Sequence, residues 1–197
     1  HNLDIFMVSE ENVRNIFEIY SKNKNIAVVE GVMGLFDGLS NEFDNFSTAH
    51  VARILDIPVI LVISAKAIST SCAAIALGFK ILDPRINICG VILNNVSSQR
   101  HYLSLKEAIE KYANIECLGY VPKNESLALK SRHLGLKLAF EENEAEILQR
   151  KNLFCEIGEK YLDLEKIKKI AKNFEPEMTF ENWEKIKNLK NKYFGKK

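Results

Sequence analysis

Two carboxylates bracket a glycine-rich segment near the start of the chain. The segment begins at Glu30, ends at Asp37-Gly38, and contains Gly31 and Gly34. Glycine permits backbone conformations and close approaches that other residues resist, and carboxylate oxygens are the ligands that Mg²⁺ prefers in proteins. The pattern therefore favours a magnesium site, and the alternative that remains is a glycine-rich turn with solvated acids.

Two later segments have side chains that could bind a base or an anion. Asn94 ends an apolar run, and its amide offers a donor and an acceptor together, which matches the edge of a purine. A turn-forming asparagine is the alternative. Arg132 and His133 stand together in a loop, where they could bind a carboxylate or a phosphate.

Short apolar runs must position these groups. They cover residues 26–30, 59–63, 88–93 and 117–121, and helical patterns lie between them at 47–55, 69–82 and 100–112. Continuous apolar runs are typical of strands covered on both faces of a parallel sheet. The alternation predicts an α/β fold with a doubly wound, mostly parallel sheet, in which ligands bind at the carboxyl ends of the strands.

Helices are expected at both ends of the chain. Val13, Ile16, Phe17 and Tyr20 recur at the spacing of one buried helix face after Ser9. From residue 141 onward the strands stop and helical patterns rich in Lys and Glu continue, ending in a Lys- and Asn-rich stretch typical of a solvated linker. We therefore expect a sheet domain over residues 1–140 and a helical extension over 141–197.

Composition excludes several classes of protein. The 197 residues include 27 Lys and Arg against 26 Asp and Glu, a net charge of +1, which argues against nucleic-acid binding by bulk charge. No apolar run approaches the roughly 20 residues that span a bilayer, and no leader pattern opens the chain, so we expect no membrane partner. The 4 cysteines form no C-x-x-C pair, which argues against zinc and fits a reducing, cytoplasmic compartment.

The phosphate-binding pattern G-x-x-x-x-G-K-[ST] occurs nowhere in the chain. An acidic residue at the end of a strand, without this loop, suggests a nucleotide site whose phosphate-binding half is missing. Because the chain begins with His1, we expect that an upstream segment is missing.

Several motifs together closely resemble the cobyrinic acid a,c-diamide synthase family. They are EGVMGLFDG at 30–38, STAH at 47–50, GVILN at 90–94, Arg100-His101, and GYVPKNESLALKSRHLG at 119–135. The resemblance runs in register from about residue 2 to residue 173. It implies a fold of the P-loop NTPase type, similar to dethiobiotin synthase.

The resemblance also implies a carbon–nitrogen ligase. The family binds ATP and Mg²⁺, transfers phosphate to the a and c side-chain carboxylates of the corrinoid, and displaces that phosphate with glutamine-derived ammonia from a C-terminal glutaminase domain of the same polypeptide. Phosphorylation makes a good leaving group, and the metal offsets its charge. A homodimer is among the assemblies that this resemblance allows.

Site residues follow from matching the motifs position by position. The resemblance implies that Glu30 and Asp37 are catalytic and hold the metal. Nucleotide-binding residues would be Asn94, Pro122, Gly31 and Gly34, and substrate-binding residues would be Ser47, Thr48, Arg132 and His133.

The chain also departs from the family. Ser64 and Thr70 occupy positions where many members have an Asp and an Arg. Since the phosphate loop and the glutaminase domain are both missing, we expect the distal part of a synthetase domain that is inactive alone. Alternatives are amidation of hydrogenobyrinic acid or nickel-sirohydrochlorin, a non-catalytic ATPase-like interaction module, and an ATPase of the chromosome-partitioning type.

Overall fold

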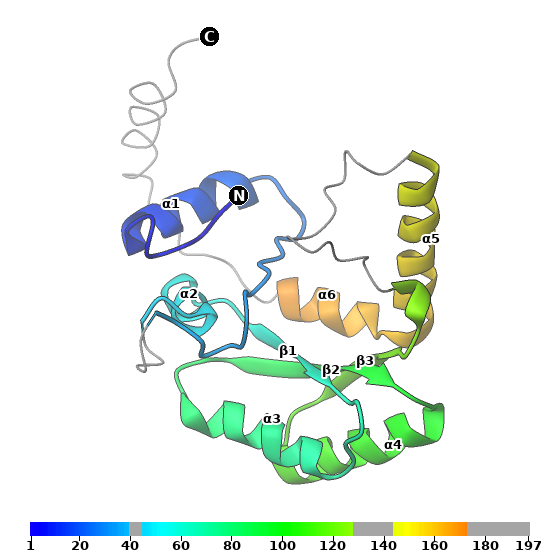
Figure 1. Ribbon diagram of the computed structural model, residues 1–197. Coiled ribbons are helices and arrows are strands. Elements are labelled where there is room, and N and C mark those ends of the chain that lie inside the picture. The colour runs from blue at the N-terminus through cyan, green and yellow to red at the C-terminus, as the bar shows by residue number, and fades with distance from the viewer. Residues whose placement is uncertain (40–44, 128–143, 173–197) are drawn as a thin grey trace. The chain divides into compact units, whose positions relative to one another are not determined.

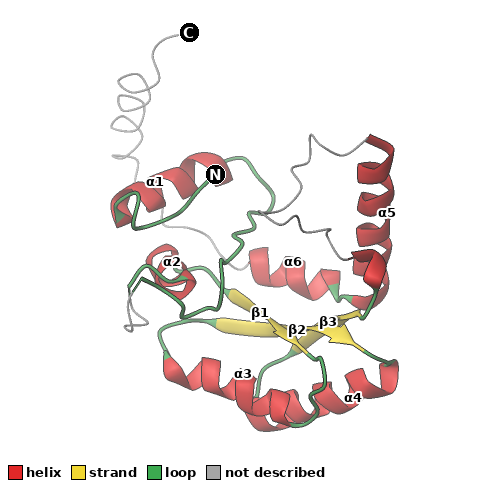
Figure 2. Ribbon diagram, in the orientation of Figure 1, coloured by secondary structure: helices red, strands yellow, loops and turns green. Residues whose placement is uncertain are grey.

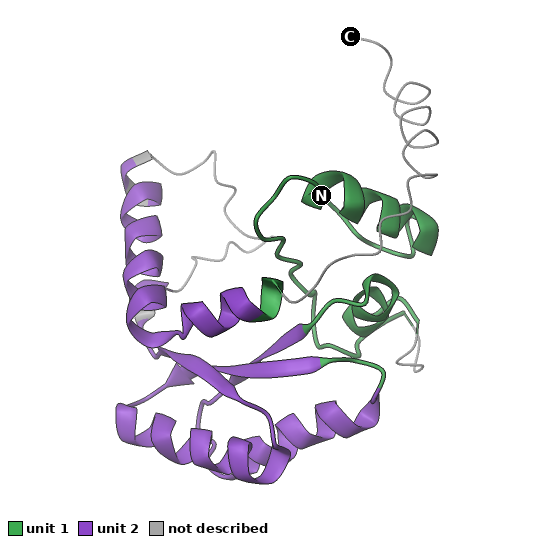
Figure 3. Ribbon diagram, turned by 180° about the vertical axis from the view of Figure 1, so that it is seen from behind, with its two compact units in different colours: residues 1–58, 85–87, 170–197 green, residues 59–84, 88–169 purple. Residues whose placement is uncertain are grey.

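The computed structural model describes residues 1–39, 45–127 and 144–172 (Figure 1). The chain divides into two compact units (Figure 3). Unit 1 is His1–Pro58, Arg85–Asn87 and Ile170–Lys197, and unit 2 is Val59–Pro84 and Ile88–Lys169. Each unit is described separately below, and the expected boundary near residue 140 stays a prediction.

Unit 2 is built on a parallel sheet of three strands in the order β1-β2-β3. The strands are β1 (Val59–Ser64), β2 (Ile88–Val96) and β3 (Cys117–Pro122). Val91 and Leu93 on the central strand are fully buried. These strands confirm the prediction of a parallel α/β fold, and they coincide with three of the four apolar runs.

Helices complete the layers of unit 2. Helices α3 (Ser71–Leu82) and α4 (Gln99–Ala108) cover one face of the sheet, and a π-helical turn, Ile109–Ala113, continues α4 (Figures 1 and 2). On the other side, α5 (Glu144–Tyr161) lies beside β3 and leads into α6 (Leu164–Lys172). These two helices confirm a helical pattern after residue 141, and residues 173–197 lie outside the described part.

The strands are covered unevenly. Leu61 and Ile63 of β1 are buried, whereas Val62 between them is 65% exposed. The described residues therefore cover the face that carries Val62 less fully than the opposite face, although the continuous apolar run predicted burial on both. At the other edge of the sheet, Asp163 N–H donates to the Leu118 carbonyl at 2.8 Å and fastens the α5–α6 link to β3.

Unit 1 contains α1 (Glu10–Ser21) and α2 (Thr48–Leu55). Helix α1 begins directly after Ser9 as predicted, and the Ser9 hydroxyl caps it by accepting from Asn12 N–H at 3.3 Å. The two helices share a small apolar core formed by Ile5, Val13 and Leu55. Of the face predicted from the spacing, Val13 is buried, Ile16 and Phe17 are half-buried, and Tyr20 is 48% exposed, so the predicted face is covered only in part.

The strand predicted at residues 26–30 is wrong. Residues 26–30 form no regular element, and Val28 is 88% exposed. A strand exists only when a neighbouring strand takes its backbone hydrogen bonds, and no described residue pairs with this run. Apolar composition alone could not predict whether that partner is present.

Candidate functional site

The segment 30–38, here called the acid loop, folds as a tight turn around Asp37. The Asp37 carboxylate accepts a hydrogen bond from Gly34 N–H at 2.8 Å, and Asp37 N–H donates to the Gly34 carbonyl at 3.1 Å. Within the turn, Met33 has a φ of +61° and Leu35 is buried. The carboxylate that the sequence singled out therefore fixes the shape of its own loop.

Contacts with the start of α2 hold the acid loop in place. Ala49 N–H donates to the Leu35 carbonyl at 2.8 Å, and the Thr48 hydroxyl donates to the Val32 carbonyl at 3.5 Å. A Cβ at Gly31 would lie 2.7 Å from Thr48 Cγ2, so any larger residue there would have to displace the Thr48 side chain. The structure thus brings together Gly31 and Thr48, which were predicted for nucleotide and substrate.

Ser47 has a structural task in the same region. It is 1% exposed, and its hydroxyl caps α2 by accepting from His50 N–H at 3.2 Å. His50 in turn accepts from Phe46 N–H through Nδ1 and donates from Nε2 to Glu10 of α1 at 3.0 Å. Both contacts stabilise the entry to α2, and a substrate contact for Ser47 stays a prediction.

The acid loop has oxygen donors that suit Mg²⁺. Glu30 and Asp37 are both exposed, and no described residue hydrogen-bonds to the Glu30 carboxylate. The described residues contain no group of three or more His, Cys, Asp or Glu side chains that could hold a metal alone. Two carboxylates still fit Mg²⁺, which usually takes one or two from the protein and completes its shell with water and phosphate oxygens.

Asn94 and Asn95 occupy the carboxyl edge of the sheet in unit 2. Asn94 is opposite Ser64 of β1, and its carbonyl oxygen Oδ1 accepts from Asn95 N–H at 2.8 Å. Asn95 has a φ of +59°, and its amide donates to the Ser64 hydroxyl at 3.3 Å. The bond at Oδ1 leaves the Asn94 NH₂ group as the part able to bind a ligand.

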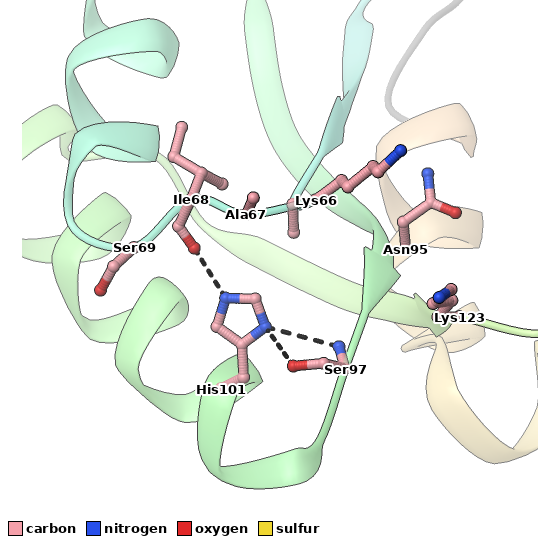
Figure 4. A pocket seen from close by; sticks show the side chains of 9 residues that line it. Lys66, Ala67, Ile68, Ser69, Asn95, Ser97, His101 and Lys123 are labelled. Atoms are coloured by element: carbon pink, nitrogen blue, oxygen red, sulfur yellow. Dashed lines mark hydrogen bonds between the residues drawn. The ribbon is translucent and has the colours of Figure 1, made fainter.

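A cavity of about 590 Å³ opens at this same edge (Figure 4). We call it the edge pocket. Its lining comes from the end of β2, the first turn of α4 and the loops that follow the three strands, namely Ala65, Lys66, Ala67, Ile68, Ser69, Asn95, Ser97, His101 and Lys123. Carboxyl ends of parallel strands are where α/β proteins bind ligands, so the pocket has the place that the fold predicts.

His101 connects two of the loops around the edge pocket (Figure 4). Its Nε2 lies 2.7 Å from the Ile68 carbonyl, and its Nδ1 lies 3.0 Å from the Ser97 hydroxyl and 3.4 Å from Ser97 N. A carbonyl can only accept, so the proton is on Nε2 and Nδ1 accepts from Ser97. The imidazole therefore holds the loop after β1 to the loop after β2.

The predicted site residues are distributed over both units. Glu30, Asp37 and their glycines belong to unit 1, whereas Asn94 and Pro122 belong to unit 2 and directly precede the pocket residues Asn95 and Lys123. Arg132 and His133 lie outside the described residues. Lys66, Ser69 and Ser97 were not predicted, although each follows closely after a strand, which is the signal that could have found them.

Buried titratable groups of unit 2 have a structural role. Burial raises the pKa of the Cys117 thiol to about 12, with the nearby Glu110 carboxylate adding to the effect. Burial also raises the pKa of Tyr102 to about 12, and the Tyr102 ring stacks on Tyr120 with centroids 4.5 Å apart. Both groups stay protonated near neutral pH, so neither is suited to act as a base or nucleophile there.

Curated relatives share one name. The chain is 47% identical over 204 residues to a cobyrinate a,c-diamide synthase of Fusobacterium nucleatum, an alignment that covers 100% of this chain and 44% of the relative. It is 48% identical over 176 residues to a protein of that name from Dehalococcoides mccartyi (89% and 38% covered). A third, from Methanococcus maripaludis, is 44% identical over 171 residues (86% and 38% covered).

The chain spans less than half the length of these curated relatives. Among the described residues, no helix is long and apolar enough to cross a membrane. The family described as AAA domain matches residues 7–131, a range that includes the acid loop, the sheet and every residue of the edge pocket. With this match over more than half of its length, the chain belongs to the AAA domain family.

Proposed function

We propose that this chain is part of an enzyme that amidates the a and c side-chain carboxylates of cobyrinate with ATP. The observation behind the proposal is the acid loop, in which Glu30 and Asp37 are exposed on a turn held by Gly34 and α2. The names of relatives that are 42–48% identical support the same substrate.

The proposed reaction has two steps. A carboxylate oxygen of the substrate attacks the γ-phosphorus of ATP, the bond to the β-phosphate oxygen breaks, and ADP leaves. Ammonia released from glutamine then attacks the acyl carbon, loses a proton to water and expels inorganic phosphate, leaving the amide. Phosphorylation is needed because a carboxylate oxygen is otherwise a very poor leaving group.

Glu30 and Asp37 would hold Mg²⁺, which offsets the negative charge of the phosphates when it is bound. Asp37 is fixed by Gly34 N–H and so offers an oxygen at a defined place. Glu30 has no described hydrogen-bond partner and is able to contact the metal directly or through water. In this proposal, Asp37 fixes the position of the metal, and the Glu30 side chain moves to contact it.

The remaining site residues complete the proposal. Asn94 and Pro122 would contact the nucleotide, with the Asn94 NH₂ group as donor to the base. Ser47, Thr48, Arg132 and His133 would contact the substrate. We also propose that the enzyme is cytoplasmic and that a glutaminase domain supplies its ammonia. The 197-residue chain alone should form no amide.

A chimaera tests the proposal. The aligned 44% of the Fusobacterium nucleatum relative is replaced by this chain, and the product is incubated with cobyrinic acid, ATP, Mg²⁺ and glutamine. We expect conversion to the a,c-diamide, which mass spectrometry detects. One ADP should be released for each amide formed. Omission of ATP or glutamine should abolish the product.

Two outcomes would contradict the proposal. One is a folded chimaera that releases ADP without forming any amide, which would favour an ATPase-like module. The other is a strong preference for hydrogenobyrinic acid or nickel-sirohydrochlorin over cobyrinic acid. The parent enzyme, assayed in parallel, shows that the assay detects the reaction.

A further inference from the structure

The lining of the edge pocket combines the ammonium groups of two lysines with apolar side chains. Lys66 follows β1 and Lys123 follows β3, and both line the same cavity (Figure 4). We propose that the edge pocket binds a carboxylate attached to an apolar scaffold, with Lys66 and Lys123 supplying the opposite charge.

The charge of the pocket favours an anion. None of its lining residues is Asp or Glu. No described residue forms an ion pair with Lys66 or Lys123, and both side chains are exposed. Each ammonium brings three donors on a flexible stem. An entering carboxylate would therefore meet opposite charge without first displacing a partner among the described residues.

The apolar part of the lining favours a carboxylate over a nucleotide phosphate. Lysine can bind either anion as a point charge, but phosphate sites typically add successive backbone N–H groups of glycine-rich loops or the planar fork of arginine. The edge pocket has neither a glycine nor an arginine among its lining residues. Ala65, Ala67 and Ile68 instead provide apolar contact, which suits a carboxylate on a short hydrocarbon arm.

His101 acts as a positioning residue for this pocket. Its bond to the Ile68 carbonyl fixes the loop 65–69, in which Ala67 takes a φ of +55° that is unfavourable for a residue with a Cβ. Its bonds to Ser97 fix the same ring against the loop after β2. Without the imidazole, the loop that presents Lys66 loses its link to Ser97, while Ala65 N–H still donates to the Asn94 carbonyl of β2 at 2.7 Å.

The identity of the carboxylate rests on the proposed function, whereas its binding to the pocket does not. Cobyrinate has several acetate and propionate arms on an apolar ring, and a pocket of about 590 Å³ is large enough for one or two such arms. We assign the pocket to an arm that anchors the macrocycle while another arm reacts.

The first test uses the 197-residue chain with glutarate as the probe and ¹⁵N NMR as the readout. We expect glutarate to shift the amide signals of Ser69, Ser97 and Lys123, and the variants Lys66→Met and Lys123→Met to weaken binding at least fivefold each. Lys151→Met, on exposed α5, is the matched control and should bind as wild type does. Methionine keeps the apolar stem and removes only the charge.

The same titration separates the two anion classes. Inorganic phosphate should shift these signals more weakly than glutarate does at equal concentration. If phosphate binds and glutarate does not, or if Lys151→Met weakens binding as much as Lys66→Met, the proposal is overturned. Unchanged signals of Val91 and Leu93 in the sheet core show that each variant is folded.

Variants of His101 test its positioning role. Glutamine can donate to the Ile68 carbonyl and accept from Ser97, so His101→Gln should keep most of the glutarate affinity while His101→Ala loses it. Wild-type ring ¹⁵N signals should show the proton on Nε2. Equal affinity in His101→Ala and wild type would remove this role.

A final arm links the pocket to the reaction. In the chimaera, Lys66→Met should raise KM for cobyrinic acid at least fivefold while KM for ATP is unchanged. If the isolated chain binds glutarate but KM does not move, the assignment to the substrate is wrong and the proposed function stands. If the chimaera makes no amide although glutarate binds, the proposed function fails and the pocket stands.

Discussion

The acid loop and the edge pocket are built by different means. Hydrogen bonds that involve Asp37, Thr48 and Ala49 hold the acid loop, and no described residue pairs with it as a strand. The edge pocket is formed by loops that leave three paired strands, and His101 links two of those loops. Paired strands of the sheet therefore fix the loops of the edge pocket, whereas the acid loop depends on a few local hydrogen bonds.

This difference indicates where each region is sensitive to change. Each of the local contacts of the acid loop is worth about 1 kcal/mol, so a single substitution can alter the loop while the unit stays folded. The loops of the edge pocket are positioned by the paired, buried strands that precede them. A substitution that distorts the sheet should therefore displace every lining residue. Substitutions in the two regions should therefore separate activity from stability.

The largest effect is expected from Glu30→Gln in the chimaera. The change keeps the shape of the side chain and removes the charge that Mg²⁺ needs, so kcat should fall roughly 100-fold, or about 2.7 kcal/mol. Amide formation over a magnesium titration measures it. Asp37→Asn should behave similarly.

Glu156→Gln on exposed α5 is the matched control and should leave kcat unchanged. If Glu30→Gln turns over as fast as this control at every magnesium concentration, the acid loop is an ordinary turn with solvated acids.

Next in size is the effect of Gly119→Ala on the stability of the sheet. Gly119 has a φ of +128°, and a Cβ there would lie 2.2 Å from the Tyr161 carbonyl oxygen. Backbone strain and this clash should lower the free energy of unfolding by about 2 kcal/mol. Urea unfolding of the 197-residue chain measures the loss.

The control for this glycine is Gly158→Ala, in the last turn of α5, where the new Cβ meets no atom of another part of the chain within 4 Å. It should raise the free energy of unfolding by roughly 0.5 kcal/mol. Equal stability of the two variants would show that the close packing of β3 against Tyr161 is not rigid.

A smaller effect is expected from Asn94→Ala in the chimaera. Loss of the NH₂ donor should raise KM for ATP about tenfold, which equals about 1.4 kcal/mol. Steady-state kinetics at saturating cobyrinic acid measure it, with Asn152→Ala on α5 as the control. An unchanged KM and an unchanged preference for ATP over GTP would show that Asn94 only shapes the edge of the sheet.

The smallest effect concerns thiol reactivity and leaves stability unchanged. Burial raises the pKa of Cys117 to about 12, so near pH 8, roughly the ordinary thiol value, Cys117 stays a protonated thiol and reacts slowly. Cys155 is exposed on α5 and should be alkylated first by iodoacetamide. Peptide mass spectrometry gives the order, and early modification of Cys117 would show that the sheet opens readily.

Sequence patterns predicted the three strands and their parallel direction, because burial leaves a clear mark on composition and the intervening helical patterns are typical of parallel strands. The runs at 59–63, 88–93 and 117–121 all became strands. The run at 26–30 has the same composition and did not, since a strand also needs a paired neighbour that composition cannot reveal. Val62, exposed in the middle of β1, shows the same limit within a correct strand.

The candidate site was predictable in its residue types more than in its geometry. Motifs pointed to Glu30, Asp37 and Asn94, but not to the use of Asp37 as the anchor of its own turn. The positive φ at Ala67 leaves no sign in the sequence, because alanine rarely takes that conformation, whereas Asn95 is of a residue type that tolerates it. Lys66 was missed for a related reason, since a single lysine after a strand has no distinctive pattern.

The central claim is that ATP activates a carboxylate of the substrate as an acyl phosphate. Cobyrinic acid labelled with ¹⁸O in its carboxylates, incubated with the chimaera, ATP and glutamine, tests this directly through the isotope content of the phosphate released. Transfer of one carboxylate oxygen to phosphorus predicts that an ¹⁸O atom appears in phosphate for each amide formed. Amide formation with unlabelled phosphate would contradict the account.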